Sequence, residues 1–303
     1  MHIFVTGGSG LTGPAVVSEL IAAGHSVTGL ARSDAAAGRL QALGAGVRRG
    51  ELADLDSLRA GADAADGALH MAFSGDFADP DGLVRLDSNA ITAMGEALVG
   101  TDKPLVMTSG TFAMTPGRVS TELDEPDPAS SAYFRIPGEQ ACLQLAQRGV
   151  RSSVVRLAPT VHGAGDYGFI AMLISAARKA GAAPYIGDGA NRWPAIHRLD
   201  AATLFRLALE KAPAGSCLHG ADESGITLRT IADLIARKLE LPTTSMTLEQ
   251  ASPLFDVGFI AGAYAIDAPA SSARTRSLLG WTPTHPTLLD DLEHGDYFDT
   301  PTS

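Results

Sequence analysis

A glycine-rich loop near the start of the chain has the spacing of a phosphate-binding turn. The segment TGGSGLTG follows a short apolar run and opens a stretch with helical spacing. A glycine tolerates positive φ, lets the backbone approach a ligand, and leaves the N–H groups of a helix start free to bind an anion. An ordinary tight turn is the alternative, but the place of the loop in the first strand–helix unit favours a dinucleotide site. The predicted contacts are Gly7, Gly10, Leu11, Thr12 and Gly13.

The residues after the second apolar run indicate which dinucleotide is bound. An NAD site usually offers a carboxylate to the ribose 2′-hydroxyl here. This chain has Arg32 and Ser33 instead, and Asp34 comes one or two places late. A guanidinium can bind a 2′-phosphate through two parallel hydrogen bonds, and the serine can add a donor. We therefore predict NADP(H) in preference to NAD(H), the alternative for Arg32 being a solvated loop charge.

Other predicted cofactor contacts lie just after further apolar runs. They are Glu51 and Leu52, then Met71, Ala72 and Phe73, then Pro159 and Val161. Glu51 and Leu52 would lie beside the adenine, and the three residues from Met71 would wall the middle of the cofactor. For Met71 and Ala72, packing in the core is the alternative.

The order of the apolar runs predicts the fold. Buried strands are expected at residues 2–7, 25–32, 47–52, 67–73, 104–110 and 151–159. Helices are expected at residues 14–24, 39–45, 55–65, 84–98, 137–149, 200–210 and 228–239. This alternation predicts an α/β fold with a doubly wound parallel sheet of the Rossmann type in residues 1–160. Residues 161–303 should form mainly a smaller substrate-binding lobe, with some segments returning to the first domain.

Composition argues against several classes of partner. The formal net charge is −11, and no block of Lys and Arg is present, so we expect neither nucleic acid nor an anionic membrane as partner. No apolar run approaches the ~20 residues of a membrane span. Cys142 and Cys217 lie far apart without metal-ligand spacing, which predicts buried thiols and no metal site. Without a visible secretory signal, we expect a cytoplasmic protein that acts on a small molecule.

The motifs together resemble the short-chain dehydrogenase/reductase superfamily, in its extended class of NAD-dependent epimerase/dehydratase-like proteins. The resemblance covers nearly the whole chain. It rests on the segments TGGSGLTG, GELADLDSL, GALHMAF, VRLAPTVHG, IHRLDAATLFRLALE and LGWTP. It implies a Rossmann-type fold, a nicotinamide cofactor and a monomer or homodimer.

The catalytic pattern departs from that family. The resemblance implies a Ser or Thr after the fifth strand and a Tyr-x-x-x-Lys pair on a helix. When the motifs are aligned, the serine falls at Gly110, the tyrosine at Ser131 and the lysine at Arg135. Arg135 would then bind the ribose of the cofactor, or it would pair with Glu139 on the helix surface. Arginine cannot deliver a proton, so the acid has to come from elsewhere.

The remaining candidates for chemistry are hydroxyls near these positions. Ser109 and Thr111 flank Gly110 and could hold the substrate oxygen. Tyr133 could act if it lies before the helix, although an aromatic packing role is equally open. Tyr167 lies in a glycine-rich loop after the sixth strand and is the preferred proton donor. An anchored turn is the alternative for Tyr167.

Five residues around that loop and the following segment are predicted to bind the substrate. They are His162, Asp166, Arg192, Trp193 and His197. A cation, a flat ring and titratable groups often line binding sites, but such clusters also join two lobes. His162 is the alternative proton donor.

Three functions remain open from the sequence. The first is an NADP(H)-dependent oxidoreductase acting on a small carbonyl or alcohol. The second is an epimerase or dehydratase of the nucleotide-sugar type that retains its nicotinamide. The third is a dinucleotide-binding regulatory protein without catalysis. NADPH consumption, a bound nicotinamide, or binding without turnover would distinguish them.

Overall fold

The larger domain of the chain is built around a parallel sheet. The computed structural model describes residues 1–74, 77, 79–255 and 258–299. Seven strands lie in the order β10-β6-β5-β4-β1-β2-β3, and each neighbouring pair is parallel. Their bounds are β1 (His2–Thr6), β2 (Ser26–Ala31), β3 (Gly46–Arg49), β4 (Gly67–His70), β5 (Pro104–Gly110), β6 (Arg151–Leu157) and β10 (Ser216–Gly220). The order reverses at β1, so the predicted doubly wound sheet is confirmed.

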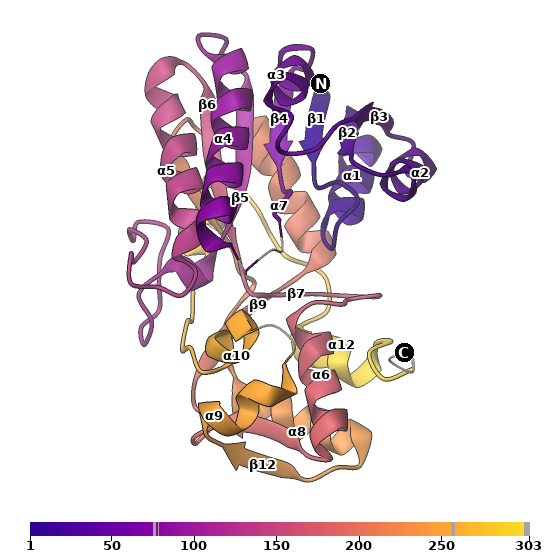
Figure 1. Cartoon of the computed structure of the whole chain (residues 1–303), viewed down its shortest axis with the longest axis vertical. Helices are drawn as coiled ribbons and strands as arrows, with labels where there is room; N and C mark the ends of the chain where they lie inside the picture. Colours follow the sequence, from indigo (N-terminus) through magenta and orange to yellow (C-terminus); the bar gives the residue numbers. More distant parts are fainter. Residues whose placement is uncertain (75–76, 78, 256–257, 300–303) are drawn as a thin grey trace.

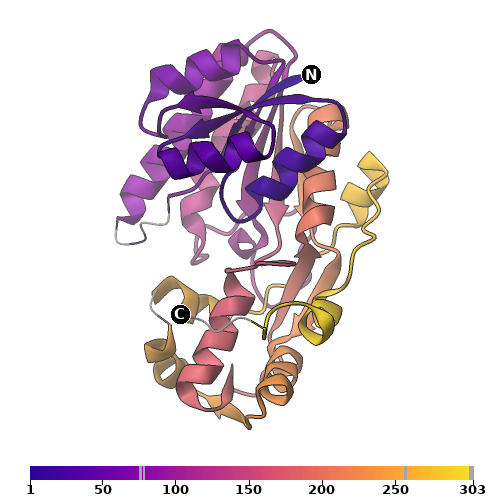
Figure 2. The same cartoon turned by 90° about the vertical axis from the view of Figure 1, so that its right-hand side faces the viewer.

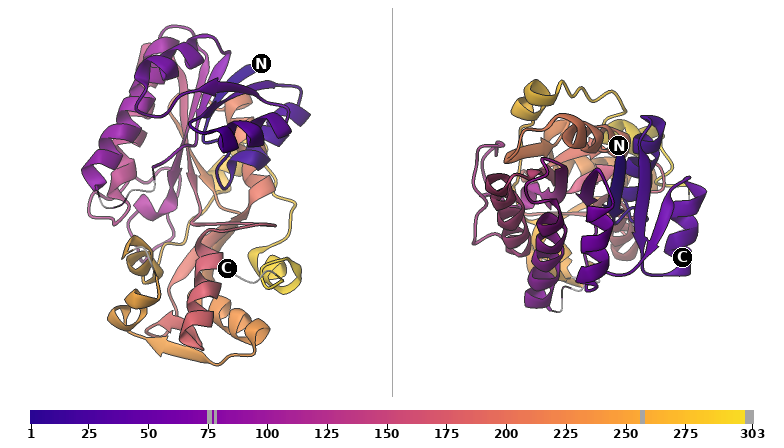
Figure 3. Two further views of the ribbon diagram at one scale, coloured as in Figure 1. Left: turned by 45° about the vertical axis from the view of Figure 1, so that its right-hand side comes forward. Right: turned by 90° about the horizontal axis from the view of Figure 1, so that it is seen from above.

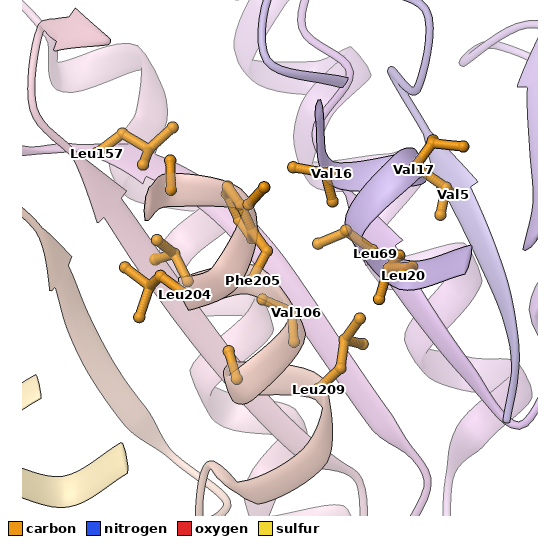
Figure 4. Packing of buried hydrophobic residues seen from close by; sticks show 14 of the residues in the cluster. Val5, Val16, Val17, Leu20, Leu69, Val106, Leu157, Leu204, Phe205 and Leu209 are labelled. Carbon is orange, nitrogen blue, oxygen red and sulfur yellow. The ribbon is translucent and has the colours of Figure 1, made fainter. Parts of the chain in front are cut away.

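Helices cover both faces of this sheet (Figure 1). One face carries α1 (Gly13–Ala22), α2 (Asp34–Ala42) and α7 (Arg198–Lys211). The other carries α3 (Leu55–Asp63), α4 (Pro80–Leu98) and α5 (Ile136–Gln144). The inner strands β1, β4 and β5 are buried on both faces and are nearly continuous apolar runs, whereas the edge strand β3 contains Arg48 and Arg49 and is partly exposed. Figure 4 shows Val16 and Leu20 of α1 in the same core cluster as Leu204 and Phe205 of α7.

The C-terminal half builds a lobe at one end of the sheet (Figures 2 and 3). Its strands are β7 (Thr160–His162), β8 (Ala183–Ile186), β9 (Arg192–His197), β11 (Glu223–Thr227) and β12 (Thr243–Met246). Its helices are α6 (Phe169–Ala180), α8 (Leu228–Leu239), α9 (Leu248–Ala251), α10 (Gly258–Tyr264) and α12 (Leu288–His294). The chain returns to the large sheet through α7 and β10, followed later by α11 (Ala273–Leu279). None of the helices in the described ranges is long and apolar enough to cross a membrane.

Several predicted boundaries differ from the structure, and two of them have clear local reasons. The strand expected at residues 67–73 ends at His70, because its partner β1 ends at Thr6 and the chain turns at Gly7 with φ of +77°. Residues 71–73 therefore leave the sheet. The helix expected at residues 84–98 begins earlier, at Pro80, since the side chain of Asp79 caps it by accepting the N–H of Gly82 at 2.8 Å.

Candidate functional site

A cavity of about 630 Å³ lies at the carboxyl edge of the large sheet. Its walls come from the loop after β1, from the residues that follow β2, β3 and β4, and from the carboxyl-terminal parts of β5 and β6, with single residues of α4 and α7. This edge is where ligands bind in doubly wound sheets. The predicted residues that line it are Gly7, Gly10, Leu11, Thr12, Gly13, Arg32, Ser33, Glu51, Leu52, Met71, Ala72, Phe73 and Tyr167.

The three glycines of the loop serve two different purposes. A Cβ on Gly7 would lie 2.5 Å from the backbone nitrogen of Ala72, and one on Gly13 would lie 2.2 Å from the carbonyl oxygen of Gly7. Both positions need glycine so that backbone can pack on backbone. Among the atoms that the structure describes, a Cβ on Gly10 would meet only the oxygen of Gly7, at 3.3 Å, and would otherwise enter open space. Gly10 therefore keeps the cavity open for a ligand.

The start of α1 offers unpaired donors to an anion. Thr12 at the N-cap makes no hydrogen bond from its side chain to the helix, and Pro14 occupies the first turn. Among the described residues, the N–H groups of this turn therefore have no acceptor from the N-cap side chain, and the helix dipole adds positive potential. Together with the open space at Gly10, this arrangement fits the pyrophosphate of a dinucleotide.

Two guanidinium groups line the cavity beside β2. Arg32 and Arg39 are exposed, and among the described residues no side chain is hydrogen-bonded or ion-paired with either. The nearby carboxylate of Asp34 pairs with Arg49 instead. Ser33 caps α2, where its hydroxyl accepts the N–H of Ala36 at 3.2 Å. This side of the cavity can therefore receive an additional phosphate. The sequence did not single out Arg39 as a cofactor contact, because an arginine within a predicted helix ordinarily lies on the helix surface in solvent.

A buried hydrogen-bonded chain lies beneath the loop. The hydroxyl of Thr6 accepts the N–H of Ala72 at 3.3 Å and contacts Nδ1 of His70 at 2.8 Å. The tautomer that suits both contacts carries its hydrogen on Nε2 of His70, which donates to Asp87 at 3.1 Å. His70 is fully buried and Asp87 nearly so. The chain thus connects β1, β4 and α4 below the cavity.

Arg135 completes this chain with a positive charge. It donates to Asp87 at 3.2 Å and to the carbonyl oxygen of Thr108 at 2.7 Å, and its guanidinium lies 4.1 Å from the centre of the Phe73 ring. Burial raises the pKa of Asp87, but Arg135 and His70 outweigh it, so that pKa is below its ordinary value. The charge of Arg135 is therefore neutralised inside the protein.

The surface pair considered for Arg135 and Glu139 does not form. Arg135 precedes α5, in the short 3₁₀ helix η2 (Tyr133–Arg135), so helical spacing does not bring the two side chains together. Glu139 is buried and pairs instead with Arg156 of β6, whose Nε lies 2.9 Å from it. Arg135 is not itself part of the cavity lining, and its closest approach to the cavity is through Phe73 and Thr108.

The hydroxyls after β5 are divided between two environments. Thr108, Ser109 and Thr111 are all buried, and each side-chain oxygen lacks a partner among the described atoms. Thr108 alone of the three lines the cavity. Alternation along β5 turns Ser109 to the opposite face of the sheet. Thr108 was not among the predicted site residues. The alternation of side chains along the strand could have predicted that Thr108 and Ser109 face opposite sides of the sheet.

The two candidate tyrosines lie in different places. Tyr167 lines the cavity and is 63% exposed. Tyr133 is 41% exposed, its ring centre lies 6.1 Å from that of Phe134, and it is not in the cavity lining. Of the two tyrosines, the structure therefore brings Tyr167 to the cavity.

Residues near the end of the described chain hydrogen-bond to the loop that carries Tyr167. Tyr297 donates to the carboxylate of Asp166 at 2.8 Å, and Asp296 accepts the N–H of Gly165 at 3.0 Å. Asp166 also accepts the N–H of Gly168 at 2.7 Å. Burial raises the pKa of Asp166 above its ordinary value. Asp166 thus stabilises the conformation of the loop through these hydrogen bonds. It is not among the residues that line the cavity.

The other predicted substrate contacts join parts of the lobe. Arg192 makes two hydrogen bonds to Asp267, at 2.9 and 2.8 Å, and Trp193 is fully buried. His162 contacts Asp291 at 2.6 Å, and its ring centre lies 5.4 Å from that of His197. None of these four predicted residues is in the cavity lining.

Burial and the neighbouring His162 lower the pKa of His197 to about 4, so His197 is neutral near pH 7. Two predicted cofactor contacts, Pro159 and Val161, also lie outside the lining, and Val161 packs in a core cluster.

Comparisons with known proteins agree with this architecture. The model of the NAD dependent epimerase/dehydratase family matches residues 3–218. The chain is 45% identical over 300 residues to uncharacterized protein C2A9.02 of Schizosaccharomyces pombe, which covers 98% of this chain and 100% of that protein. It is 29% identical over 244 residues to 4-hydroxy-2-methyl-3-oxo-4-farnesyl-3,4-dihydroquinoline-1-oxide ketoreductase of Stigmatella aurantiaca, covering 78% of this chain and 72% of the relative.

Solved structures share the fold at low sequence identity. The dTDP-glucose 4,6-dehydratase DesIV of Streptomyces venezuelae, solved with NAD, gives a TM-score of 0.79 at 17% identity and covers 99% of this chain and 97% of that one. UDP-glucuronic acid 4-epimerase of Bacillus cereus, also with NAD, gives 0.78 at 18% identity and covers 99% of each chain. These likenesses concern the fold of the whole chain, including the lobe.

Proposed function

The chain belongs to the NAD dependent epimerase/dehydratase family, and from this we propose that it is an NADP(H)-dependent oxidoreductase that interconverts a small carbonyl compound and its alcohol. The observation that carries the proposal is the pair Arg32 and Arg39, which lines the cavity beside the glycine loop without a carboxylate partner among the described residues. A 2′-phosphate would provide the missing anion. The ketoreductase relative supports the reaction class.

The residues that line the cavity would have different roles in cofactor binding and in proton transfer, according to their positions. When bound, the nicotinamide supplies or accepts the hydride. The loop through Gly10 and the start of α1 bind the pyrophosphate. Tyr167 would donate or accept the proton at the substrate oxygen, because it is the tyrosine that belongs to the cavity lining. Thr108 lines the cavity as well, whereas Ser109 and Thr111, which were predicted to hold the substrate oxygen, do not.

Arg135 would act without touching the substrate. Its guanidinium contacts Phe73 and the carbonyl oxygen of Thr108, so it positions two residues that line the cavity. Because Asp87 neutralises its charge, it would not stabilise a tyrosinate in the way that a nearby free cation would. We therefore assign Arg135 to positioning.

Steady-state assays with the purified full chain test the reaction class. NADPH is mixed with small aldehydes and ketones, and the loss of nicotinamide absorbance is followed, with NADH as the comparison. Net oxidation of NADPH, faster than that of NADH at equal concentration, is the expected result. The family also contains enzymes that return the hydride to the same molecule. Purified protein with a retained nicotinamide and no net oxidation would support an epimerase or dehydratase instead.

A further inference from the structure

The loop between β7 and α6 carries Tyr167 and meets the glycine loop at the cavity. A Cβ on Gly168 would lie 3.2 Å from Cδ2 of Leu11, so the two loops are in close contact. Leu11 and Tyr167 both line the cavity. The position of residues 163–168 therefore decides whether this wall of the cavity is complete.

The loop has only modest means of fixing its own conformation. Inside it, the N–H of Asp166 donates to the carbonyl oxygen of Gly163 at 3.1 Å, and the N–H of Gly168 donates to the Asp166 carboxylate at 2.7 Å. Gly163 and Gly165 have φ of +131° and +70°. Glycines leave such a turn many alternative conformations, so contacts from outside the loop are needed to select one.

Two neighbouring residues near the end of the described chain supply such contacts. The hydroxyl of Tyr297 donates to Asp166 at 2.8 Å and accepts the N–H of Gly163 at 3.4 Å. The carboxylate of Asp296 accepts the N–H of Gly165 at 3.0 Å. Burial and the carboxylate of Asp166 raise the pKa of Tyr297, so its hydroxyl stays a neutral donor. Three hydrogen bonds thus join the loop to residues that lie 131 to 134 positions later in the chain.

The helix that precedes these two residues is itself fixed to the lobe. In α12, Leu288 and Leu292 are buried, and Glu293 pairs with Arg237 and Lys238 of α8. The hydrogen bonds from the loop therefore end on a segment that follows directly on a well-packed helix. This arrangement ties the loop at the cavity to the body of the lobe.

On the basis of the proposed function, we propose that Tyr297 and Asp296 are positioning residues, which hold the 163–168 loop where Tyr167 completes the wall of the cofactor cavity. Neither residue belongs to the cavity lining, so both act through the loop. Without their hydrogen bonds the loop populates other conformations and Tyr167 leaves the wall more often. A bound dinucleotide is then released faster, and proton transfer by Tyr167 becomes less frequent.

Hydrogen–deuterium exchange of the full chain without cofactor tests the hold on the loop. Tyr297→Phe keeps the ring and removes only the hydroxyl, and Asp296→Ala removes one acceptor from an exposed position. We expect the amides of residues 163–168 to exchange at least about fivefold faster in each variant, while those of α8 keep the wild-type rate. Tyr185→Phe is the matched control, because its hydroxyl accepts from Arg229 elsewhere in the lobe. Wild-type exchange of the loop in both variants, or equal acceleration in the control, overturns the proposal.

The release of NADPH tests whether the position of the loop matters to the cofactor site. A stopped-flow chase follows nicotinamide fluorescence while excess NADP⁺ displaces bound NADPH. Tyr297→Phe and Asp296→Ala should raise the dissociation rate at least about fivefold. Asp296→Asn keeps an acceptor oxygen for the N–H of Gly165 and should restore most of the wild-type rate. Lower thermal stability with an unchanged dissociation rate would show a merely structural role and would overturn the proposal, as would equal rates in Asp296→Asn and Asp296→Ala.

The failure of the proposed function would be seen separately. A wild-type protein that does not bind NADPH, or that binds it and never oxidises it with a carbonyl compound, fails as an oxidoreductase. Exchange of the loop amides requires no cofactor, so it still reports whether Tyr297 and Asp296 hold the loop.

Discussion

The two halves of the cavity are built from different kinds of interaction. The half beside β2 and β3 consists of a glycine loop, a helix start and exposed guanidiniums, all from the first 53 residues. The half beside β4, β5 and β6 draws on residues from Met71 to Phe205 and rests on a buried chain of hydrogen bonds. The first half forms through the local conformation of neighbouring residues, whereas the second half forms only when distant parts of the chain come together in the fold. Substitutions should therefore affect binding in the first half, and turnover and stability in the second.

The largest expected effect is the loss of cofactor binding in Gly10→Val. The side chain would enter the open space of the cavity, while the only neighbour of its Cβ among the described atoms is the oxygen of Gly7 at 3.3 Å. Calorimetry with NADPH should show no binding, and circular dichroism should show a folded protein. Gly13→Val is the contrasting variant and should fail to fold, because its Cβ would lie 2.2 Å from that oxygen. Normal affinity in Gly10→Val would remove the dinucleotide assignment.

Tyr167→Phe should lower kcat by about 10²–10⁴-fold if Tyr167 transfers the proton. The affinity for NADPH should not change, because only one hydroxyl is removed at the exposed edge of the cavity. Tyr133→Phe is the matched control, since Tyr133 is outside the lining. Stopped-flow turnover and calorimetry on both variants measure the two effects. Full activity in both would mean that neither tyrosine is the acid.

Asp87→Ala should destabilise the protein by about 3–5 kcal/mol, because it leaves Arg135, whose side chain is only 12% exposed, without a counter-charge. The Nε2–H of His70 loses its acceptor as well. Urea unfolding followed by circular dichroism measures the change. Asp34→Ala breaks the pair with Arg49 on the exposed side of the cavity and should change stability very little. A similar loss in both variants would contradict the distinction between the halves.

Arg32→Ala should weaken NADPH binding by about 10–100-fold, since a charge-assisted contact contributes roughly 1.5–3 kcal/mol. Binding of NADH should remain almost the same. Arg39→Ala, from the same wall of the cavity, shows whether the second guanidinium shares the phosphate. Calorimetry with both cofactors measures the difference. An equal loss for NADPH and NADH, or a wild-type preference for NADH, would exclude the 2′-phosphate as the ligand of Arg32.

Local patterns predicted the sheet and much of one wall of the site. Every predicted strand of the large sheet is present, because most are short apolar runs closed by a glycine, a polar turn or a proline, and the third, which contains two arginines, is the edge strand β3. The prediction of site residues was less accurate where a side chain could point either to the cavity or to the opposite face of the sheet. Thr108 and Ser109 are neighbours in sequence, but alternation along β5 turns only Thr108 to the cavity. Arg192 and Trp193 have the composition of a binding site, yet they pair and pack within the lobe.

The sequence by itself determined the glycine loop, because positive φ at Gly7 and close backbone contacts at Gly13 are requirements that no other residue meets. Only the tertiary structure decided the partner of Arg135. Four-residue spacing pointed to Glu139, but Arg135 lies before the helix, and Asp87 reaches it from α4 across 48 positions of the chain. A buried charged group forms an ion pair with the oppositely charged group that the fold places next to it. Distance along the sequence carries no information about which counter-charge that is.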